Sequence, residues 1–147
     1  MNSIVGNTNL IAGNQNKLIG NQNLIAGNLN TISGNSNGLQ GSNNIVVGAQ
    51  NFAVGNQNLV SGNSNQILGS SNFVDGHLNQ LIGDQNGVSG SANKIAGSIN
   101  GVQGDWNLIK GNLNAILGTE NVVGGNQNII SGSANYVSGN NNIISSH

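Results

Sequence analysis

The chain has 147 residues, only 5% of them charged, and its three Lys against four Asp and Glu give a formal net charge of −1. This balance excludes the basic surface on which nucleic-acid binding depends and the acidic tail of a charged interaction segment. The absence of Cys excludes disulfides, thiol catalysis and cysteine metal sites, and it leaves the redox compartment open.

The first five residues, Met1–Val5, form a partial repeat that leads directly into the first complete one. They contain neither the charged n-region and apolar run of a signal peptide nor an apolar stretch long enough to span a membrane. We therefore expect no targeting segment and no membrane span in this sequence, and the compartment stays open.

From Gly6 to Ser145 the sequence is twenty tandem heptads without an insertion, as in Gly20–Ala26. Position one is Gly and position four is Asn in all twenty heptads, and position six is always apolar. Position two is mostly Asn or Ser, whereas positions three, five and seven vary. A fixed period of this kind predicts a single array domain over residues 1–147 rather than a globule.

Three backbones compete for a seven-residue period. A coiled coil needs two apolar positions per heptad, and twenty interior glycines would cost a helix about 10–20 kcal/mol relative to Ala. Disorder fits the low complexity but gives no reason for position six to stay apolar in every copy. The pattern therefore favours an all-β parallel β-solenoid, with a strand over positions four to seven and a Gly-centred corner over positions one to three.

Alternation along each strand predicts that positions two, four and six point inward and positions three, five and seven point outward. Position six then forms an Ile/Val/Leu core. The invariant Asn side chains would stack at about 4.8 Å and bond to the copies above and below and to corner backbone groups, which removes the penalty for burying them. The members of one such ladder are Asn9, Asn23, Asn37, Asn51, Asn65, Asn79, Asn93, Asn107, Asn121 and Asn135.

A coil of this solenoid could contain seven, fourteen or twenty-one residues. At position five no residues seven apart are identical, one pair is identical at a spacing of twenty-one, and four pairs are identical at fourteen. We therefore predict fourteen residues per coil, two heptads forming the two sheets of a flattened roll. Ten such coils would be roughly 48 Å long.

The repeat, as in Asn44-Ile45-Val46-Val47-Gly48 and Asn86-Gly87-Val88-Ser89-Gly90, resembles the Asn-x-Val-x-Gly heptads of the grass ice-recrystallisation-inhibition (antifreeze) β-rolls. The similarity extends over the whole chain. It is weaker to the β-roll repeats in the heads of trimeric bacterial adhesins. The resemblance implies a left-handed roll that binds ice through a flat outer face rich in Thr, Ser and Val. This chain has only three Thr, and no two of them stack at positions five or seven.

The outward positions five and seven hold twenty-one apolar residues among forty, which favours an interaction surface. One sheet carries twelve of its twenty as apolar residues, and we predict it to be an assembly face. Its main candidates are Leu10, Leu24, Phe52, Val54, Leu68, Ile82, Leu108, Val122 and Tyr136. The other sheet carries a second apolar face of Ile45, Val47, Leu59, Phe73, Leu117, Ile129 and Ile143.

These faces, together with terminal coils that lack a polar cap, favour a non-enzymatic structural solenoid. We expect it to associate with copies of itself, end to end and through an apolar sheet. The alternative function is ice binding, with ice as the partner, and the third is an adhesive surface roll. The three Lys (Lys17, Lys94 and Lys110) are interpreted as residues that restrain lateral aggregation.

No catalytic, cofactor or metal site is expected. His77, Asp75 and Asp84 are close in sequence, but a fourteen-residue coil places His77 and Asp84 at opposite corners. No Ser has a His and a carboxylate converging on it, and the calcium β-roll pattern is absent. Trp106 occupies an outward position three and is interpreted as local packing rather than as an anchor for a partner or glycan.

Overall fold

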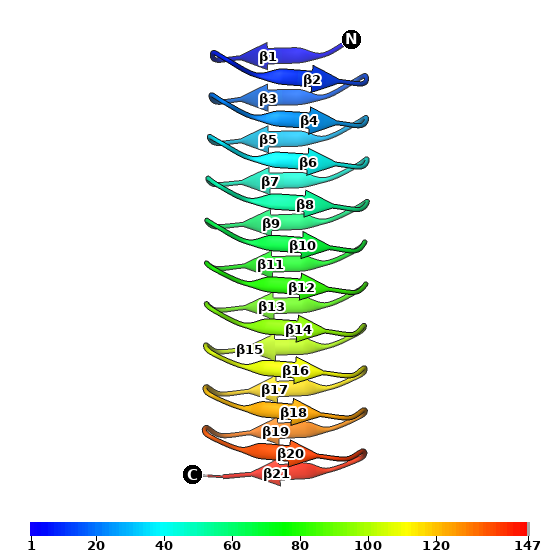
Figure 1. The fold of residues 1–147 in the computed structure, drawn as a ribbon, viewed down its shortest axis with the longest axis vertical. Coiled ribbons are helices and arrows are strands. Elements are labelled where there is room, and N and C mark those ends of the chain that lie inside the picture. Colours follow the sequence, from blue (N-terminus) through cyan, green and yellow to red (C-terminus); the bar gives the residue numbers. More distant parts are fainter. Residues whose placement is uncertain (147) are drawn as a thin grey trace.

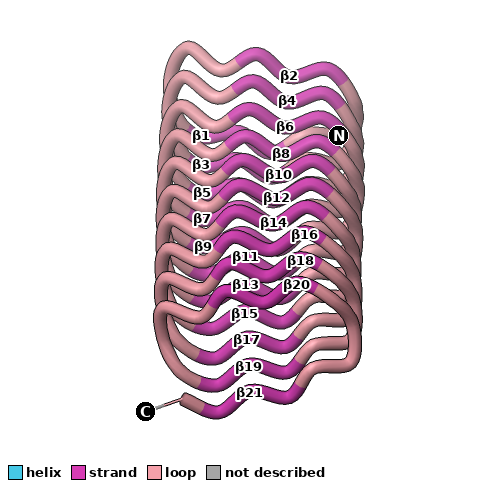
Figure 2. Tube along the Cα trace, turned by 60° about the horizontal axis from the view of Figure 1, so that its bottom comes forward, coloured by secondary structure: helices cyan, strands magenta, loops and turns pink. Residues whose placement is uncertain are grey.

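The computed structural model describes residues 1–146. Within them the chain forms twenty-one short parallel strands that alternate between two sheets, with the first and last strands at opposite ends of the long axis (Figure 1). Loops join the two layers along both edges (Figure 2). The prediction of an all-β parallel solenoid of about ten coils is confirmed.

We call the eleven-stranded sheet the odd sheet and the ten-stranded sheet the even sheet. The strands of the odd sheet are β1 (Ser3–Val5), β3 (Lys17–Ile19), β5 (Thr31–Ser33), β7 (Ile45–Val47), β9 (Leu59–Ser61), β11 (Phe73–Asp75), β13 (Gly87–Ser89), β15 (Gly101–Gln103), β17 (Ala115–Leu117), β19 (Ile129–Ser131) and β21 (Ile143–Ser145). The strands of the even sheet are β2 (Leu10–Ala12), β4 (Leu24–Ala26), β6 (Gly38–Gln40), β8 (Phe52–Val54), β10 (Gln66–Leu68), β12 (Gln80–Ile82), β14 (Lys94–Ala96), β16 (Leu108–Lys110), β18 (Val122–Gly124) and β20 (Tyr136–Ser138).

Every strand pairs with the strand fourteen residues away. Gln66, for example, lies opposite Gln80 in the even sheet, and Phe73 lies opposite Gly87 in the odd sheet. The coil of fourteen residues is therefore confirmed. Because the register is fixed, each heptad position forms a straight column along the solenoid, and a residue's neighbours are those fourteen before and after it.

The strands cover positions five to seven, one residue fewer than predicted. Position four fails to extend the ladder because its backbone N–H donates to a side chain instead of a carbonyl. In one coil the Asn23 N–H bonds the Oδ1 of Asn9 at 3.0 Å, while the Asn23 carbonyl still accepts from Leu10 N at 2.9 Å. The invariant Asn thus ends the corner and begins the strand.

Position six forms the core between the sheets. The eighteen position-six side chains from Leu18 to Val137 are buried in one continuous cluster, with Ile11 and Ile144 partly buried at its ends. Since both sheets contribute to this single layer, the hydrophobic core is a line along the axis, as the sequence predicts.

The predicted Asn ladder is confirmed, and the structure contains a second one on the other side of the core. In both ladders each interior Asn donates from Nδ2 to the Oδ1 of the Asn one coil before and to a corner Gly carbonyl. For Asn79 these bonds reach Asn65 Oδ1 at 3.1 Å and Gly90 O at 2.8 Å. The second ladder consists of Asn16, Asn30, Asn44, Asn58, Asn72, Asn86, Asn100, Asn114, Asn128 and Asn142.

The bonds of the ladders leave no buried polar side-chain atom without a partner within residues 1–146. Burial of seventeen asparagines is compatible with stability because an amide removed from water costs little once its donors and acceptors are paired.

The prediction that position two points inward is wrong. Position-two side chains lie exposed or half-buried at the corners. Their role is to accept from the backbone of the preceding coil, as Asn21 Oδ1 does from Asn7 N at 2.8 Å. Strand alternation does not extend to this position because the backbone reverses at position three.

All twenty position-three residues adopt the left-handed conformation, with φ between 57° and 60°, although none of them is Gly. The conformation is unfavourable for most side chains, most of all for a β-branched residue such as Ile99. Stacking offsets this cost, since each position-three N–H donates to the position-two carbonyl of the coil before, as Gln22 N does to Asn7 O at 3.1 Å.

The corner glycines are sterically required, whereas a strand glycine such as Gly101 is not. Gly69 has φ +140°, and a Cβ placed on it would collide with the carbonyl oxygen of Gly83 in the next coil. Gly101 lies within a strand, and a Cβ there would meet no atom within 4 Å.

We therefore expect Gly69→Ala to destabilise the fold by about 2–5 kcal/mol, through backbone strain and overlap with the next coil. Gly101→Ala should be neutral or stabilising by up to about 1 kcal/mol. Thermal unfolding followed by circular dichroism compares the two variants. Equal melting temperatures would contradict the assignment of a steric role to the corner glycine.

Candidate functional site

Positions five and seven of the odd sheet present a regular two-dimensional array of side chains to the outside. Along each strand the two outward positions are about 6.6 Å apart, and along the axis each is repeated about every 4.8 Å. The strands hydrogen-bond in an unbroken order from β1 to β21. The odd sheet is therefore an elongated, regular surface with one strand direction throughout.

Hydroxyl groups distinguish the odd sheet from the even sheet. Outward Ser or Thr side chains occur along most of the odd sheet, whereas the even sheet has one, Ser138. The hydroxyl residues of the odd sheet are Ser3, Thr31, Ser33, Ser61, Ser89, Ser131 and Ser145. The other outward residues of this sheet include branched aliphatic side chains such as Val47, Leu59 and Ile129.

The charges of the odd sheet are confined to two outward residues. Lys17 lies on β3 and Asp75 on β11, and the outward residues of the described strands β5–β9 and β13–β21 are all uncharged. Two neutral sections therefore flank Asp75, and the longer one spans five strands.

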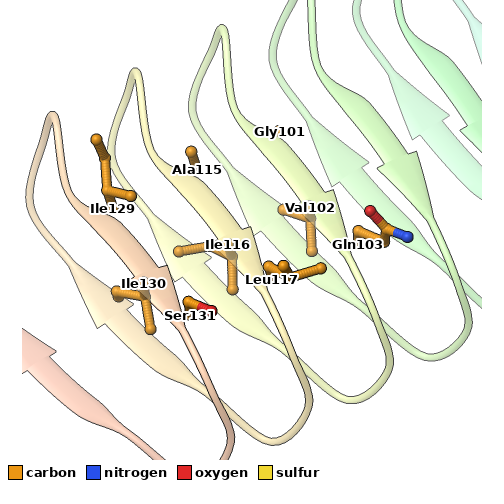
Figure 3. Close-up of a pocket in the computed structure, with 9 residues that line it drawn as sticks. All are labelled: Gly101, Val102, Gln103, Ala115, Ile116, Leu117, Ile129, Ile130 and Ser131. Carbon is orange, nitrogen blue, oxygen red and sulfur yellow. The ribbon is translucent and has the colours of Figure 1, made fainter. Parts of the chain in front are cut away.

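A shallow trough of about 420 Å³ lies within the longer section, because Gly101 and Ala115 have almost no side chain to fill it. Figure 3 shows three columns: Gly101, Ala115 and Ile129 in the first, the position-six residues Val102, Ile116 and Ile130 in the second, and Gln103, Leu117 and Ser131 in the third. The residues of the predicted second apolar face thus lie on this same sheet, interleaved with its hydroxyl groups.

The structure places the residues of the predicted assembly face on the even sheet, where they form separate groups. Val54, Leu68 and Ile82 are consecutive in the position-seven column. Leu108, Val122 and Tyr136 are consecutive in the position-five column. Lys94 and Lys110 lie between the two groups, while Leu10, Leu24 and Phe52 complete the face toward the N-terminal end.

The three residues considered for chemistry, His77, Asp75 and Asp84, do not converge. His77 lies at one corner, where its Nδ1 accepts from Asn63 N at 3.0 Å, and Asp84 lies at the opposite corner, where its Oδ1 accepts from Ser70 N at 2.6 Å. Both side chains therefore do what Asn and Ser do elsewhere at position two. Asp75 lies apart from them, on the outer face of β11.

Among residues 1–146 there is no group of three or more His, Asp or Glu side chains placed to hold a metal ion. In the same part of the chain, no helix has the length and apolar character needed to cross a membrane.

Trp106 does not pack locally, contrary to its interpretation from the sequence. Its side chain is 69% exposed, because the left-handed backbone at position three directs it away from the roll. No feature of the sequence indicates this backbone conformation, since position three is never Gly.

Comparison with known proteins supports the resemblance seen in the repeat. No curated protein matches the chain. A family model described as the grass antifreeze beta roll matches residues 1–95 and 69–147, so that the two matches together cover the whole chain. With the fourteen-residue coil, the paired Asn ladders and the hydroxyl-bearing outer sheet described above, this match shows that the chain belongs to the grass antifreeze β-roll family.

Proposed function

We propose that this protein is a non-enzymatic ice-binding protein and that it adsorbs to ice through the outer face of the odd sheet. Membership of the grass antifreeze β-roll family supports the activity. The observation that carries the choice of face is the distribution of hydroxyl groups, which line the odd sheet and are almost absent from the even sheet.

The spacing of the odd sheet supports this choice. Its outward side chains repeat at about 4.8 Å along the axis and about 6.6 Å along each strand. These distances are on the scale of the oxygen repeats in the planes of ice. A regular array of this kind can hold the first layer of water in positions that continue into a crystal, and the fixed register maintains the array over the length of the roll.

The chemistry of the face supports it as well. Hydroxyl groups such as those of Ser89 and Ser131 can anchor water by hydrogen bonds, while neighbouring side chains such as Leu117 and Ile129 restrict the orientations of the water over them. An ammonium or carboxylate would hold its own hydration shell in a different arrangement. The uncharged section from β13 to β21 is therefore the strongest part of the proposed surface.

A second candidate function is self-association through the even sheet, which the sequence ranks first because the outward faces are apolar, the terminal coils lack a polar cap and Thr is scarce. The supporting observation is that large apolar side chains remain exposed there, including Ile82 and Tyr136. Apolar groups in contact with solvent over several neighbouring strands favour a protein partner, and a second copy of this chain is the partner we propose. End-to-end stacking remains a prediction.

Recrystallisation of ice in a frozen sucrose solution tests the first candidate. We expect ice grains to stay small at micromolar protein, and single crystals grown in its presence to become faceted. Analytical ultracentrifugation of the same sample determines whether the active species is a monomer. Grain growth equal to that in buffer would contradict ice binding. A sedimentation coefficient that keeps the value of a monomer at high protein concentration would contradict self-association.

A further inference from the structure

Trp106 forms one wall of a slot at the corner where the odd sheet passes into the even sheet. The position-three column at this corner contains Leu78, Ala92 and Trp106 in consecutive coils. Leu78 is 62% exposed and Trp106 is 69% exposed, while the small Ala92 between them is half-buried. A groove of about 290 Å³ lies over these three residues, bordered by Gln80 and Lys94 of the even sheet.

The width of the slot suits one flat ring. Leu78 and Trp106 are two coils apart, which separates their backbones by about 9.6 Å at the strand spacing. Each of the two side chains takes up half of its own van der Waals thickness within this separation. The space that remains between them accommodates a single ring in contact with both. At the opposite corner the large residues Ile99 and Leu113 are in adjacent coils, so that no equivalent gap separates them.

The polar groups around the slot identify the type of ring. Gln80 and Lys94 are paired neighbours on β12 and β14 and supply hydrogen-bond donors along one side. The side-chain amide of Gln80 supplies an acceptor as well, through its Oε1. A ring with C–H groups on its faces can pack against the two walls, and polar groups around its edge can hydrogen-bond to the border residues. The edge of an aromatic hydrocarbon would leave the border residues without hydrogen-bond partners.

The geometry points to a sugar-binding site, and we propose that the slot between Leu78 and Trp106 holds one pyranose unit of a neutral polysaccharide. Lys94 is the one charged residue that lines the groove, and two carboxylates lie at the same corner: Asp105 beside Trp106 and Glu120 one coil beyond it. The corner therefore has no excess positive charge to favour an acidic sugar. The site is small and open compared with typical ligand pockets, which predicts weak binding with a dissociation constant on the order of 1 mM for a short oligosaccharide.

The single Trp of the chain makes the test direct, because all indole emission comes from this site. We expect cellohexaose to change the fluorescence of the full chain in a saturable way, with a smaller response to oligogalacturonate and to phenolic acids. Ala92→Leu should fill the slot and weaken binding by at least about tenfold. The fold accepts this variant, because Leu78 and Leu113 already adopt the same backbone conformation.

Leu113→Ala at the opposite corner is the matched control and should leave the titration unchanged. Trp106→Ala, followed by calorimetry, should also abolish binding. An absence of saturable signal, the same affinity in Ala92→Leu, or stronger binding of the acidic or aromatic probe would each overturn the proposal. The slot lies away from the odd-sheet face, so this result is independent of whether the protein binds ice.

Discussion

Leu117→Lys is expected to abolish most of the ice recrystallisation inhibition while leaving the fold intact. Leu117 lies at position seven of β17, within the uncharged section of the odd sheet, and its side chain is 52% exposed. An ammonium here would keep its hydration shell and raise a long side chain above the array, so water over the neighbouring strands could not adopt the arrangement of ice. We expect the protein concentration needed for half-maximal inhibition to rise at least about tenfold, which corresponds to about 1.4 kcal/mol of adsorption free energy.

Leu68→Lys is the matched control on the even sheet. Leu68 also occupies position seven, on β10, and is 43% exposed. The fold accepts Lys at this heptad position, since Lys110 already occupies it on β16. We expect this variant to retain wild-type ice activity and to reduce any self-association. If Leu68→Lys lost ice activity and Leu117→Lys kept it, the even sheet would be the ice-binding face and our choice of face would be wrong.

This pair of variants is needed because the sequence only weakly distinguishes which of the two outer faces binds a partner. Apolar content favours the even sheet as the binding surface, since twelve of its twenty outward residues are apolar. The distribution of Ser gives the opposite ranking for ice, because the fourteen-residue register places Ser33, Ser61 and Ser89 in one column of one sheet. The coil length predicted from the sequence already implies this column, but a count of Thr alone overlooks it.

The fold could be predicted further than the function because its determinants repeat. Every coil has the same three requirements: Gly at position one for the close corner, Asn at position four for the ladder, and an apolar residue at position six for the core. Even the coil length was readable, because residues stacked in one column, such as Leu10 and Leu24, tend to be alike. In a solenoid the neighbours of each residue are its own copies, so local sequence similarity carries tertiary information.

The corner could not be predicted in the same way. Alternation placed position two inside, yet the backbone at position three is left-handed in every coil and turns position two outward. No sequence signal marks this, because residues as different as Gln57, Ile99 and Trp106 adopt one conformation there. The neighbouring coils impose it: they hold the Gly two residues before position three and the Asn directly after it, and the two residues between this Gly and this Asn have to follow.

The same argument explains why position three accepts side chains as different in size as those of Ala92 and Trp106. A side chain at position three points away from the core and the ladders. The fold therefore restricts the backbone conformation at this position but not the type of side chain. Exposed Leu78 and Trp106 therefore cost the core nothing. Because the fold does not dictate these side chains, Leu78 and Trp106 are informative about function, as are the outward residues of the two sheets.

Asn79→Ala in the middle of one ladder is expected to have the largest effect on stability. The substitution removes the Oδ1 that accepts from Asn93 N at 3.0 Å and from Asn93 Nδ2 at 3.1 Å, and the Nδ2 that donates to Gly90 O at 2.8 Å. Asn93 N and Gly90 O are left without a partner, whereas Asn93 Nδ2 keeps its bond to Gly104 O and Asn65 Oδ1 keeps its bond to the backbone N–H at residue 79. At about 1–3 kcal/mol for each of the two groups without a partner, the loss is about 2–6 kcal/mol. The melting temperature of a chain of this length should fall by about 5–20 °C.

Asn28→Ala is the control, because this Asn is exposed at position two and accepts one bond, from Asn14 N at 2.7 Å. Water can replace that acceptor at the surface, so the expected loss is below about 1 kcal/mol. Thermal unfolding of the two variants followed by circular dichroism separates the roles of the two asparagines. If both melted at the same temperature, the buried ladder would contribute no more than a surface corner, and stability would have to come from the single line of position-six side chains. That line contains only one apolar residue per heptad, which is why we expect the ladders to be indispensable.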